Sequence, residues 1–213
     1  MNLKFRFIAL IITMFALSAN AVPVKYYSIN SLFGISMRVT NSICKDDNGF
    51  IWASSKTGIL RLTDDDYRIY QLPYETEGVL MVWLIYGNSV LTAYTNNGQV
   101  FQYNSVYDRF ELKFNLSELL DVKDLDVFSL VADSKNDYWF TLNIGLYKYN
   151  SEKLQQIDNT LNDKSSITWY SDSKFLIANS AGIRLFDTQS LTSESIYETN
   201  TTTLIAVSTA VFG

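Results

Sequence analysis

The fold of this chain is decided by the stretch Asp46–Leu62, which reads DDNGFIWASSKTGILRL. Its residues 47–49, Asp-Asn-Gly, are typical of a tight turn, because Asn and Gly accept the positive φ that a two-residue hairpin needs. The apolar run Phe50–Ala53 is rich in strand-forming residues. Gly58 allows a second reversal before the return strand Ile59–Leu62. The stretch therefore predicts a turn, a strand, a second turn and a second strand.

The same pattern recurs along the chain at a period of about 40 residues, which is typical of propeller blades. Glycines at corresponding places are separated by 40, 47 and 37 residues, and a mid-strand residue lies six positions before each. Four short strands per unit at this period predict an all-β fold, a β-propeller with four-stranded antiparallel blades. A β-sandwich would also have many short strands, but it gives no reason to repeat one glycine at one place. The glycines are Gly58, Gly98, Gly145 and Gly182, and the mid-strand residues are Trp52, Thr92, Trp139 and Leu176.

The repeat predicts the domain plan of residues 22–213, an incomplete propeller. The four expected blades cover approximately residues 39–70, 79–112, 127–157 and 167–197. A short helical turn is predicted at Ser117–Leu120, between the second and third units. Residues 202–213 begin like the first strand of a further blade. A ring usually has more blades than this, so we interpret the chain as the front part of a longer protein or as a truncated product of one.

Residues 1–21 have the features of a secretory signal peptide. Lys4 and Arg6 precede the apolar run Phe7–Leu17, which is too short to span a bilayer comfortably. Residues 19–21, Ala-Asn-Ala, form a small-x-small cleavage site. We therefore expect cleavage after Ala21 and export to the periplasm; an uncleaved membrane anchor is the alternative.

Composition argues against several classes of function. The net charge is −5 with no basic run, which argues against nucleic acid as a partner. The chain contains 0 His, so catalytic triads that need His and the usual zinc sites are excluded. The acidic stretches Asp46–Gly49 and Asp64–Asp66 lack calcium-loop spacing with a closing Glu and are interpreted as solvated turns. We expect no metal, no cofactor and no catalytic residue, although a carboxylate pair for glycoside chemistry remains open among the 22 acids.

The aromatic residues and the single cysteine have structural and functional interpretations. Trp52 and Trp139 are expected to pack one blade onto the next, with ligand stacking as the minor alternative. Stacking on sugar rings is conceivable for three other aromatic residues, but blade packing is preferred for each; they are Tyr74, Trp83 and Trp169. Cys44 is expected to be a packed residue rather than a reactive thiol. No ligand-binding residue can be assigned from the sequence.

Residues 42–62 resemble the two-component-regulator propeller repeat. That repeat runs as an apolar strand, Asp-x-x-Gly, apolar-Trp, a few small residues and Gly-Leu-x-Arg-Tyr. Residues 133–149 resemble it again, with Asp137 in place of the turn glycine, whereas the second and fourth units lack a Trp at that place. Residues 26–36 resemble the opening strand and loop of the same family. The likeness covers nearly all of the chain after residue 21.

The resemblance implies a sensory role. Together with a signal peptide, such repeats are typical of the extracytoplasmic half of hybrid two-component sensor histidine kinases from Bacteroidetes. It implies an oligosaccharide as the ligand, and the remainder of the same sensor and a homodimer mate as partners. The kinase itself needs a phospho-accepting His, and this chain has 0 His, so we expect that activity only in a part beyond residue 213. The alternatives are an exported scaffold for other proteins, or a carbohydrate-active lyase or hydrolase.

Overall fold

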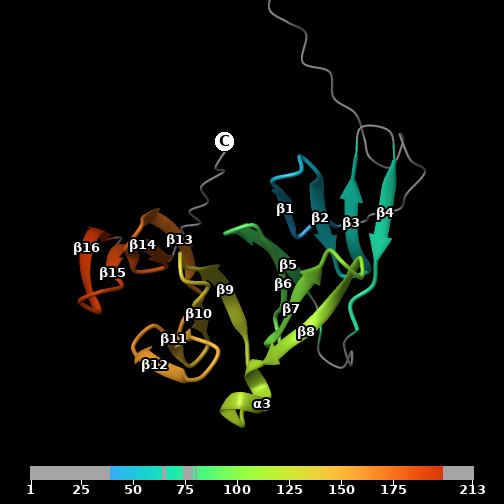
Figure 1. The fold of residues 1–213 in the computed structure, drawn as a ribbon. Coiled ribbons are helices and arrows are strands. Elements are labelled where there is room, and N and C mark those ends of the chain that lie inside the picture. Colours follow the sequence, from blue (N-terminus) through green and yellow to red (C-terminus); the bar gives the residue numbers. More distant parts are fainter. Residues whose placement is uncertain (1–38, 64–65, 74–78, 80, 199–213) are drawn as a thin grey trace, which may run out of the picture. The chain divides into compact units, whose positions relative to one another are not determined.

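The computed structural model describes residues 39–63, 66–73, 79 and 81–198, all within one compact unit that comprises residues 37–213. The described residues form sixteen strands in four separate four-stranded sheets, and one short helix (Figure 1). Within each sheet every strand pairs with the next strand along the chain, and all pairs are antiparallel. The predicted all-β propeller class is therefore confirmed, and the sandwich alternative, which needs two larger sheets, is excluded.

The strands fall into four blades in chain order. Blade 1 contains β1 (Ser42–Lys45), β2 (Ile51–Ser55), β3 (Gly58–Leu62) and β4 (Tyr67–Tyr70). Blade 2 contains β5 (Val82–Gly87), β6 (Val90–Thr95), β7 (Gln99–Asn104) and β8 (Arg109–Asn115). Blade 3 contains β9 (Val127–Ala132), β10 (Tyr138–Leu142), β11 (Gly145–Tyr149) and β12 (Leu154–Asp158). Blade 4 contains β13 (Ser166–Ser171), β14 (Lys174–Asn179), β15 (Gly182–Asp187) and β16 (Thr192–Glu198).

Helix α3 (Leu116–Leu120) connects blades 2 and 3, where the sequence predicts a helical turn. The side chain of Asn115 caps it by accepting a hydrogen bond from the Ser117 N–H at 3.2 Å, which satisfies one of the unpaired donors of the first turn. Asp121 ends the helix in the left-handed conformation, with φ 54°. Among the described residues, no helix is long and apolar enough to cross a membrane.

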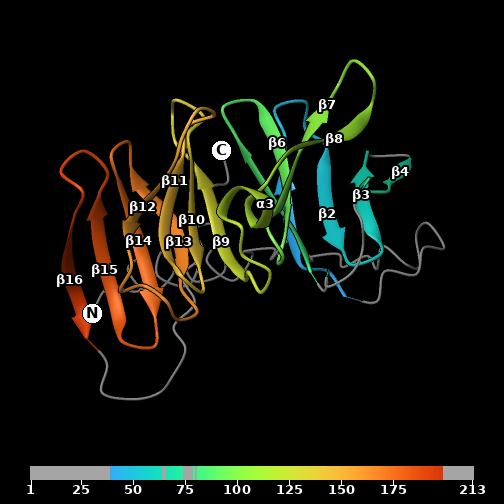
Figure 2. The ribbon, with the colours of Figure 1, turned by 90° about the horizontal axis from the view of Figure 1, so that it is seen from below.

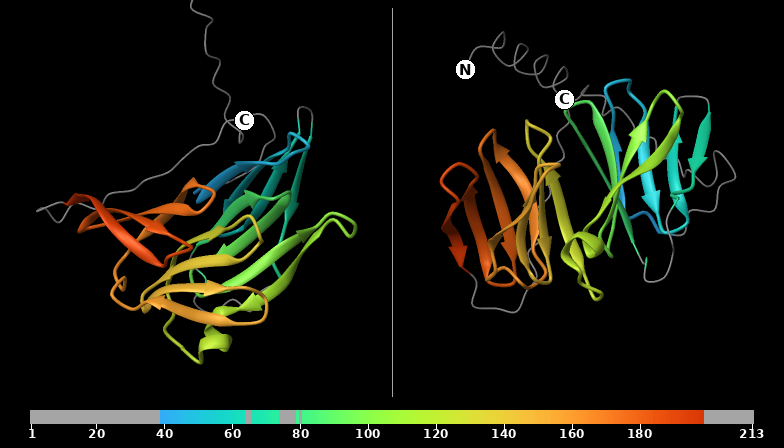
Figure 3. Two further views of the ribbon diagram at one scale, coloured as in Figure 1. Left: turned by 60° about the vertical axis from the view of Figure 1, so that its left-hand side comes forward. Right: turned by 60° about the horizontal axis from the view of Figure 1, so that its bottom comes forward.

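Consecutive blades are neighbours through their first strands. Strands β1 and β2 contact β5, β5 contacts β9, and β9 and β10 contact β13. Figures 2 and 3 show the four sheets following one another in chain order from three further directions. Such radial stacking, with each first strand beside the next, is the arrangement of a propeller.

The core consists of three apolar clusters, one in each gap between consecutive blades. In the first gap, Trp52 and Ile59 of blade 1 pack with Phe101 of blade 2. The second gap joins blades 2 and 3 in the same manner, and in the third gap Trp139 of blade 3 packs with Phe175 of blade 4. Burial of apolar surface therefore takes place between sheets, and each described blade depends on its neighbours for stability.

Strand register determines which residues of a blade face the next one. In blade 1 the row across the four strands is Cys44, Trp52, Arg61 and Arg68. The corresponding row of blade 3 is Val131, Trp139, Lys148 and Gln155. Both tryptophans contact aromatic rings of the following blade. We call the side of a blade that carries this row its forward face.

The first turn of the repeat differs from the predicted two-residue hairpin. Asp46 and Phe50 are joined by a backbone hydrogen bond of 3.0 Å, so three residues, 47–49, form the loop, and Gly49 has φ 85°. In blade 3 the same hydrogen bond joins Asp133 and Asp137 at 2.9 Å, and the residue with positive φ is Asn136, at 62°. The sequence-based alignment of Asp137 with the turn glycine is therefore wrong by one position. Asn fills the left-handed site because its short polar side chain tolerates that conformation.

The four repeated glycines are not equivalent. Gly58, Gly145 and Gly182 are the first residues of the third strands and pair with the last residues of the second strands. Gly98 instead lies in a three-residue loop, because Tyr94 pairs with Val100 and the strand begins one residue later. The interpretation of all four as one turn position is therefore wrong for Gly98.

The predicted signal peptide (residues 1–21) and the predicted start of a further blade (residues 202–213) lie outside the described residues, as do Tyr74, Asp64 and Asp65.

Candidate functional site

The Asp that begins the repeat turn accepts hydrogen bonds from the protein's own N–H groups. The Asp46 carboxylate accepts hydrogen bonds from the backbone of Asn48 (3.0 Å) and Phe50 (2.9 Å), and from the Trp52 indole N–H (2.8 Å). Asp133 accepts the equivalent three bonds, the last from the Trp139 indole at 3.2 Å. Because three N–H donors engage each carboxylate, this motif holds the turn and orients the tryptophan.

Both repeat tryptophans are core residues, as the sequence predicts. Trp52 and Trp139 are 0% exposed. A cation lies over each indole ring: the Arg61 Cζ is 5.6 Å from the Trp52 centroid, and the Lys148 Nζ is 5.0 Å from the Trp139 centroid. Each cation comes from the residue paired with the tryptophan in the neighbouring strand. Ligand stacking on these rings is therefore blocked by the protein itself.

The other aromatic candidates also pack between blades. Trp83 is half-buried and stacks on Tyr94 with ring centroids 5.2 Å apart. Trp169 is half-buried against Phe175 and donates its indole N–H to the Ala132 carbonyl at 2.8 Å. These contacts agree with the packing interpretation. Both side chains contribute to gaps between blades.

Cys44 lies on the forward face of blade 1, against the first apolar cluster. Burial, followed by the charge of Asp46, raises the pKa of its thiol to about 12. A thiol with so high a pKa stays protonated at neutral pH and is a weak nucleophile. The expected packed role fits this environment.

Paired side chains on the first two strands bond each blade to the next. The Ser54 hydroxyl donates to the Val82 carbonyl at 2.7 Å, and the Ser42 hydroxyl accepts the Leu84 N–H at 2.6 Å. In blade 3, Thr141 donates to the Ser165 carbonyl at 2.7 Å. Ser129, which pairs with Thr141 as Ser42 pairs with Ser54, accepts a hydrogen bond from the blade 4 backbone at 3.2 Å.

Blade 2 uses an aromatic pair at these same two positions. Trp83 and Tyr94 are directly opposite each other, and the Tyr94 hydroxyl lies beside the Leu130 backbone and the Ser129 side chain of blade 3. The tyrosine is buried, and burial raises its pKa well above the ordinary value. A polar contact between neighbouring blades is thus kept, although the residue types differ.

The turns between first and second strands are also bonded to one another. The Ser89 hydroxyl donates to the Asp47 carboxylate at 2.6 Å, and the Asp47 N–H donates to the Tyr86 hydroxyl at 3.1 Å. The Ser89 bond and then the Tyr86 bond hold the pKa of Asp47 below its usual value. The next pair of turns, in blades 2 and 3, is linked in the same way: the Asn88 side-chain amide donates to the Asp133 carbonyl at 2.6 Å.

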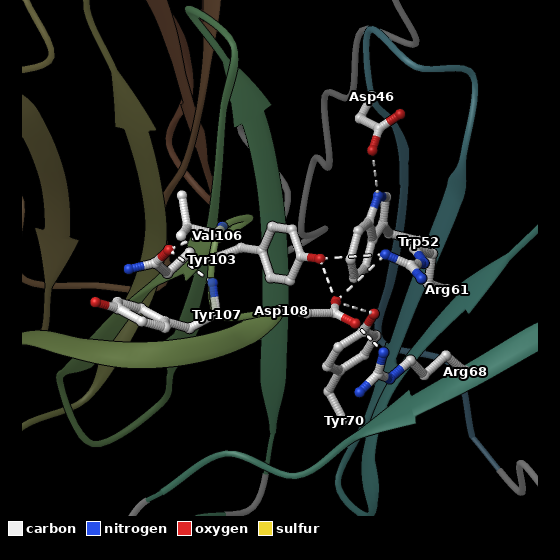
Figure 4. Close-up of polar contacts among 10 residues, drawn as sticks. Asp46, Trp52, Arg61, Arg68, Tyr70, Tyr103, Val106, Tyr107 and Asp108 are labelled. Carbon is white, nitrogen blue, oxygen red and sulfur yellow. Dashed lines mark hydrogen bonds and ion pairs between the residues drawn. The ribbon is translucent and has the colours of Figure 1, made fainter.

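A cluster of polar side chains surrounds Asp108, in the β7–β8 hairpin of blade 2 (Figure 4). Four side chains donate to its carboxylate. The Tyr70 hydroxyl bonds to Oδ1 at 2.7 Å and the Arg61 Nη1 lies 3.4 Å from the same oxygen. Tyr103 also donates to Oδ1, and Arg68 forms an ion pair with Oδ2. We call these four donors the carboxylate clamp: Arg61, Arg68, Tyr70 and Tyr103.

The clamp joins two blades, because three of its residues belong to strands β3 and β4 of blade 1 and one to β7 of blade 2. Aromatic rings hold its guanidinium groups: the Arg61 Cζ lies 5.0 Å from the Phe50 centroid, and the Arg68 Cζ lies 5.4 Å from the Tyr70 centroid. Burial is the largest cause that raises the pKa of Tyr70 to about 12, and the neighbouring Tyr103 adds to the shift. The Tyr70 phenol therefore keeps its proton and donates a hydrogen bond at neutral pH.

Sequence reasoning missed this cluster, although one signal for it exists. Arg61 and Arg68 are directly opposite each other in adjacent strands, and like charges at such a position are destabilising. Two arginines that face each other therefore require a nearby anion. The strand prediction places them opposite each other, but it cannot say that the anion lies 40 residues further along the chain.

The structure brings together no set of metal-ligating residues in the ranges that it describes: no group of three His, Cys, Asp or Glu side chains could hold an ion there. The expectation that the chain holds no metal stays a prediction, as does the absence of catalytic residues.

The buried hydroxyl and thiol groups predict how stability depends on pH. Tyr70, Tyr94 and Cys44 have pKa values above their ordinary values of 10.0, 10.0 and 9.0. Above pH 9 the unfolded chain loses these protons before the folded chain does, so the free energy of unfolding falls as pH rises. We expect the decline to begin near pH 9 and to steepen above pH 10, by up to about 1.4 kcal/mol per pH unit for each group.

Urea denaturation between pH 8 and pH 11 measures this decline. The Tyr94→Phe variant removes one of the groups and is expected to show a shallower slope. Tyr170→Phe is the matched control, because Tyr170 is 67% exposed. Equal slopes for the wild-type protein and Tyr94→Phe would contradict the assignment.

No family model matches this sequence, and no curated protein matches it. Solved structures do match its fold. The extracellular domain of a candidate one component system, BT4673, from B. thetaiotaomicron superposes with a TM-score of 0.60 at 17% identity, over 76% of this chain and 23% of that chain. The extracellular domain of a candidate hybrid two component system, BT3049, from the same organism gives a TM-score of 0.56 at 16% identity, over 76% and 25%.

The WD40 β-propeller domain of Doa1 matches with a TM-score of 0.54 at 16% identity, over 74% of this chain and 54% of that chain. At these identities the likeness concerns the fold alone. This chain spans about a quarter of the length of the two B. thetaiotaomicron domains. The four stacked sheets and these comparisons together identify the chain as a β-propeller.

Proposed function

We propose that this chain is part of the extracytoplasmic ligand-sensing region of a two-component sensor, and that the region is itself non-catalytic. Two observations together support the proposal. The blades stack through buried repeat tryptophans, and the same fold occurs in two extracellular domains that are described as parts of bacterial signalling systems. The sequence features of residues 1–21 support export. Under this proposal the protein acts in the periplasm, in a larger sensor anchored in the inner membrane.

The ligand that we propose is an oligosaccharide. Four of the described acids offer little support for an enzyme, because their carboxylates are engaged by other groups of the protein. Asp46 and Asp133 accept N–H bonds, Asp108 lies in the carboxylate clamp, and Asp137 pairs with Lys148 at 2.8 Å. A catalytic carboxylate must lie within hydrogen-bond reach of the substrate atom that it serves, whereas these carboxylates face donors and cations of the protein itself. Binding without turnover fits such a set of residues better.

Thermal denaturation of the purified full chain with a panel of oligosaccharides tests this function. A ligand present at 100 times its Kd stabilises the folded state by about 2.7 kcal/mol, which corresponds to a rise in Tm of about 5–11 °C for a protein of this size. We expect one class of oligosaccharide to raise Tm without being consumed. Chromatography of the incubated sugar is the control, because loss of the sugar would indicate the lyase or hydrolase alternative.

The DNA that follows codon 213 provides the second test. A sensor requires a membrane-spanning helix and a kinase to be encoded in the same frame. The sensor proposal would be contradicted if neither the helix nor the kinase were encoded there and no sugar of the panel raised Tm.

A protein-binding scaffold is the second candidate, and one observation favours it. The β7–β8 hairpin presents two apolar or aromatic side chains to solvent at its tip, Val106 at 84% exposure and Tyr107 at 66%. Exposed side chains of this kind are common at protein interfaces. A scaffold predicts a protein partner, and it predicts that the Val106→Ser, Tyr107→Ser double variant loses that partner while its Tm stays unchanged.

A further inference from the structure

The carboxylate clamp has the composition of a receptor for an anion. Two guanidinium groups and two phenol hydroxyls converge on one carboxylate, and both types of donor are preferred partners of carboxylate oxygens. Arg61 and Arg68 together carry two positive charges against the single negative charge of Asp108. The bound carboxylate therefore leaves one charge uncompensated within the cluster.

The clamp is positioned by contacts that do not involve Asp108. The Arg61 guanidinium lies among the rings of Phe50, Trp52 and Tyr70, at 5.0, 5.6 and 5.6 Å from their centroids. The Tyr70 and Tyr103 rings pack edge to face at 5.8 Å. These aromatic contacts fix the donors before an anion arrives, which is the preorganisation that a binding site requires.

Asp108 reaches the clamp from a loop that is also held without it. The Asn104 side chain accepts hydrogen bonds from the Val106 N–H (3.0 Å) and the Tyr107 N–H (3.3 Å), and Asn104 pairs with Arg109 at the base of the hairpin. Asp108 itself has φ 51°, a left-handed conformation that glycine adopts readily. The loop can therefore keep its shape when the Asp108 side chain is removed.

The clamp is open to solvent on one side. The side chain of Arg61 is 20% exposed and that of Asp108 28%, whereas Arg68 is 56% exposed. A small anion could reach the Arg68 side of the cluster without separation of the blades. The half-buried Arg61 side would then provide the less solvated contacts that strengthen an ion pair.

We propose that the carboxylate clamp is a binding site for a carboxylate-bearing ligand, and that Asp108 is its tethered occupant. A free ligand competes with the tethered side chain, which has the advantage of an intramolecular contact. The native protein therefore binds free carboxylates weakly, and removal of the Asp108 side chain opens the site. This inference does not depend on the sensory role.

The test uses the full chain with the substitution Asp108→Gly and two probes, acetate and glucuronate, which carry the same carboxylate on a small group and on a sugar ring. At ten times its Kd a carboxylate should raise the Tm of Asp108→Gly by about 3–6 °C. Chloride at equal ionic strength and neutral acetamide are the ligand controls, and neither should produce this rise. The wild-type protein should respond by less than about 1 °C, because Asp108 fills the site.

The matched protein control is Asp108→Gly combined with Arg68→Met, which keeps an unbranched apolar stem but removes the guanidinium group and its charge. We expect this double variant to lose most of the response to acetate. If Asp108→Gly does not fold without ligand, recovery of folded protein during refolding in acetate, compared with acetamide, gives the same measurement. The proposal is overturned if neither carboxylate exceeds chloride and acetamide, or if the wild-type protein and the Arg68→Met double variant respond as strongly as Asp108→Gly.

Discussion

Replacing Trp139 by alanine is expected to lower the free energy of unfolding by about 3–5 kcal/mol, the usual cost of deleting a large aromatic side chain from a core. The indole is 0% exposed and lies between blades 3 and 4, where it contacts Phe175 and Phe186 with ring centroids 5.5 and 5.9 Å apart. The substitution would leave a cavity in the gap that joins the two sheets. The effect should therefore reach beyond blade 3 and loosen the packing of blade 4.

Urea denaturation measures the loss, and hydrogen exchange shows its location. Trp139→Phe distinguishes the contribution of the ring from that of its hydrogen bond. It keeps an aromatic side chain but leaves the Asp133 carboxylate without the indole donor, and it should lower the free energy of unfolding by about 1–3 kcal/mol. Tyr170→Ala, on an exposed aromatic side chain of blade 4, should change stability by less than about 0.5 kcal/mol. If Trp139→Ala were as stable as Tyr170→Ala, the gap between the blades could not be the core.

Replacing Gly145 by alanine is expected to cost about 2–5 kcal/mol, although it adds a single methyl group. Gly145 has φ 129°, and a Cβ at this position would lie 2.4 Å from the backbone oxygen of Asp158 in β12. The register between β11 and β12 shifts next to this point, between Leu146 and Tyr147, so the glycine permits the close approach of the fourth strand. An alanine would meet both an unfavourable φ and a clash with main chain that cannot rotate away.

Gly87→Ala is the matched control for Gly145→Ala. Gly87 also lies at a strand end, but a Cβ there meets nothing within 4 Å. We expect its effect on the free energy of unfolding to stay within about 0.5 kcal/mol. Equal urea midpoints for the two variants would show that the close approach of β12 does not constrain Gly145. Gly182→Ala should behave like Gly145→Ala, because its Cβ would lie 2.0 Å from the Tyr197 backbone oxygen.

The sequence by itself determined the class of fold and the identity of the central core residues. The period of the repeat predicts four-stranded blades, and the place of Trp52 and Trp139 in the repeat predicts that both are buried. These inferences succeed because they rest on local chemistry. Strand propensity, turn residues and the alternation of side chains act between residues close together in the chain.

The details of the turns could be predicted only in part from sequence. Asn136 and Gly49 occupy the same left-handed position, but a pattern that looks for glycine overlooks the asparagine. Gly98 matches the glycine spacing, yet a loop that is one residue longer moves it out of the strand. Each error is a shift of a single residue, which the backbone register shows and a sequence alignment by spacing does not.

Only the tertiary structure decided that Asp108 lies in the carboxylate clamp with Arg61, Arg68 and Tyr70. These partners are 38 to 47 residues away in sequence, and they meet because two complete sheets stack in one register. No local pattern encodes that meeting. The neighbours of a residue in the chain determine which sheet it joins. The charge that the residue faces depends instead on how whole blades pack, and the apolar surface that the sheets bury together sets that packing.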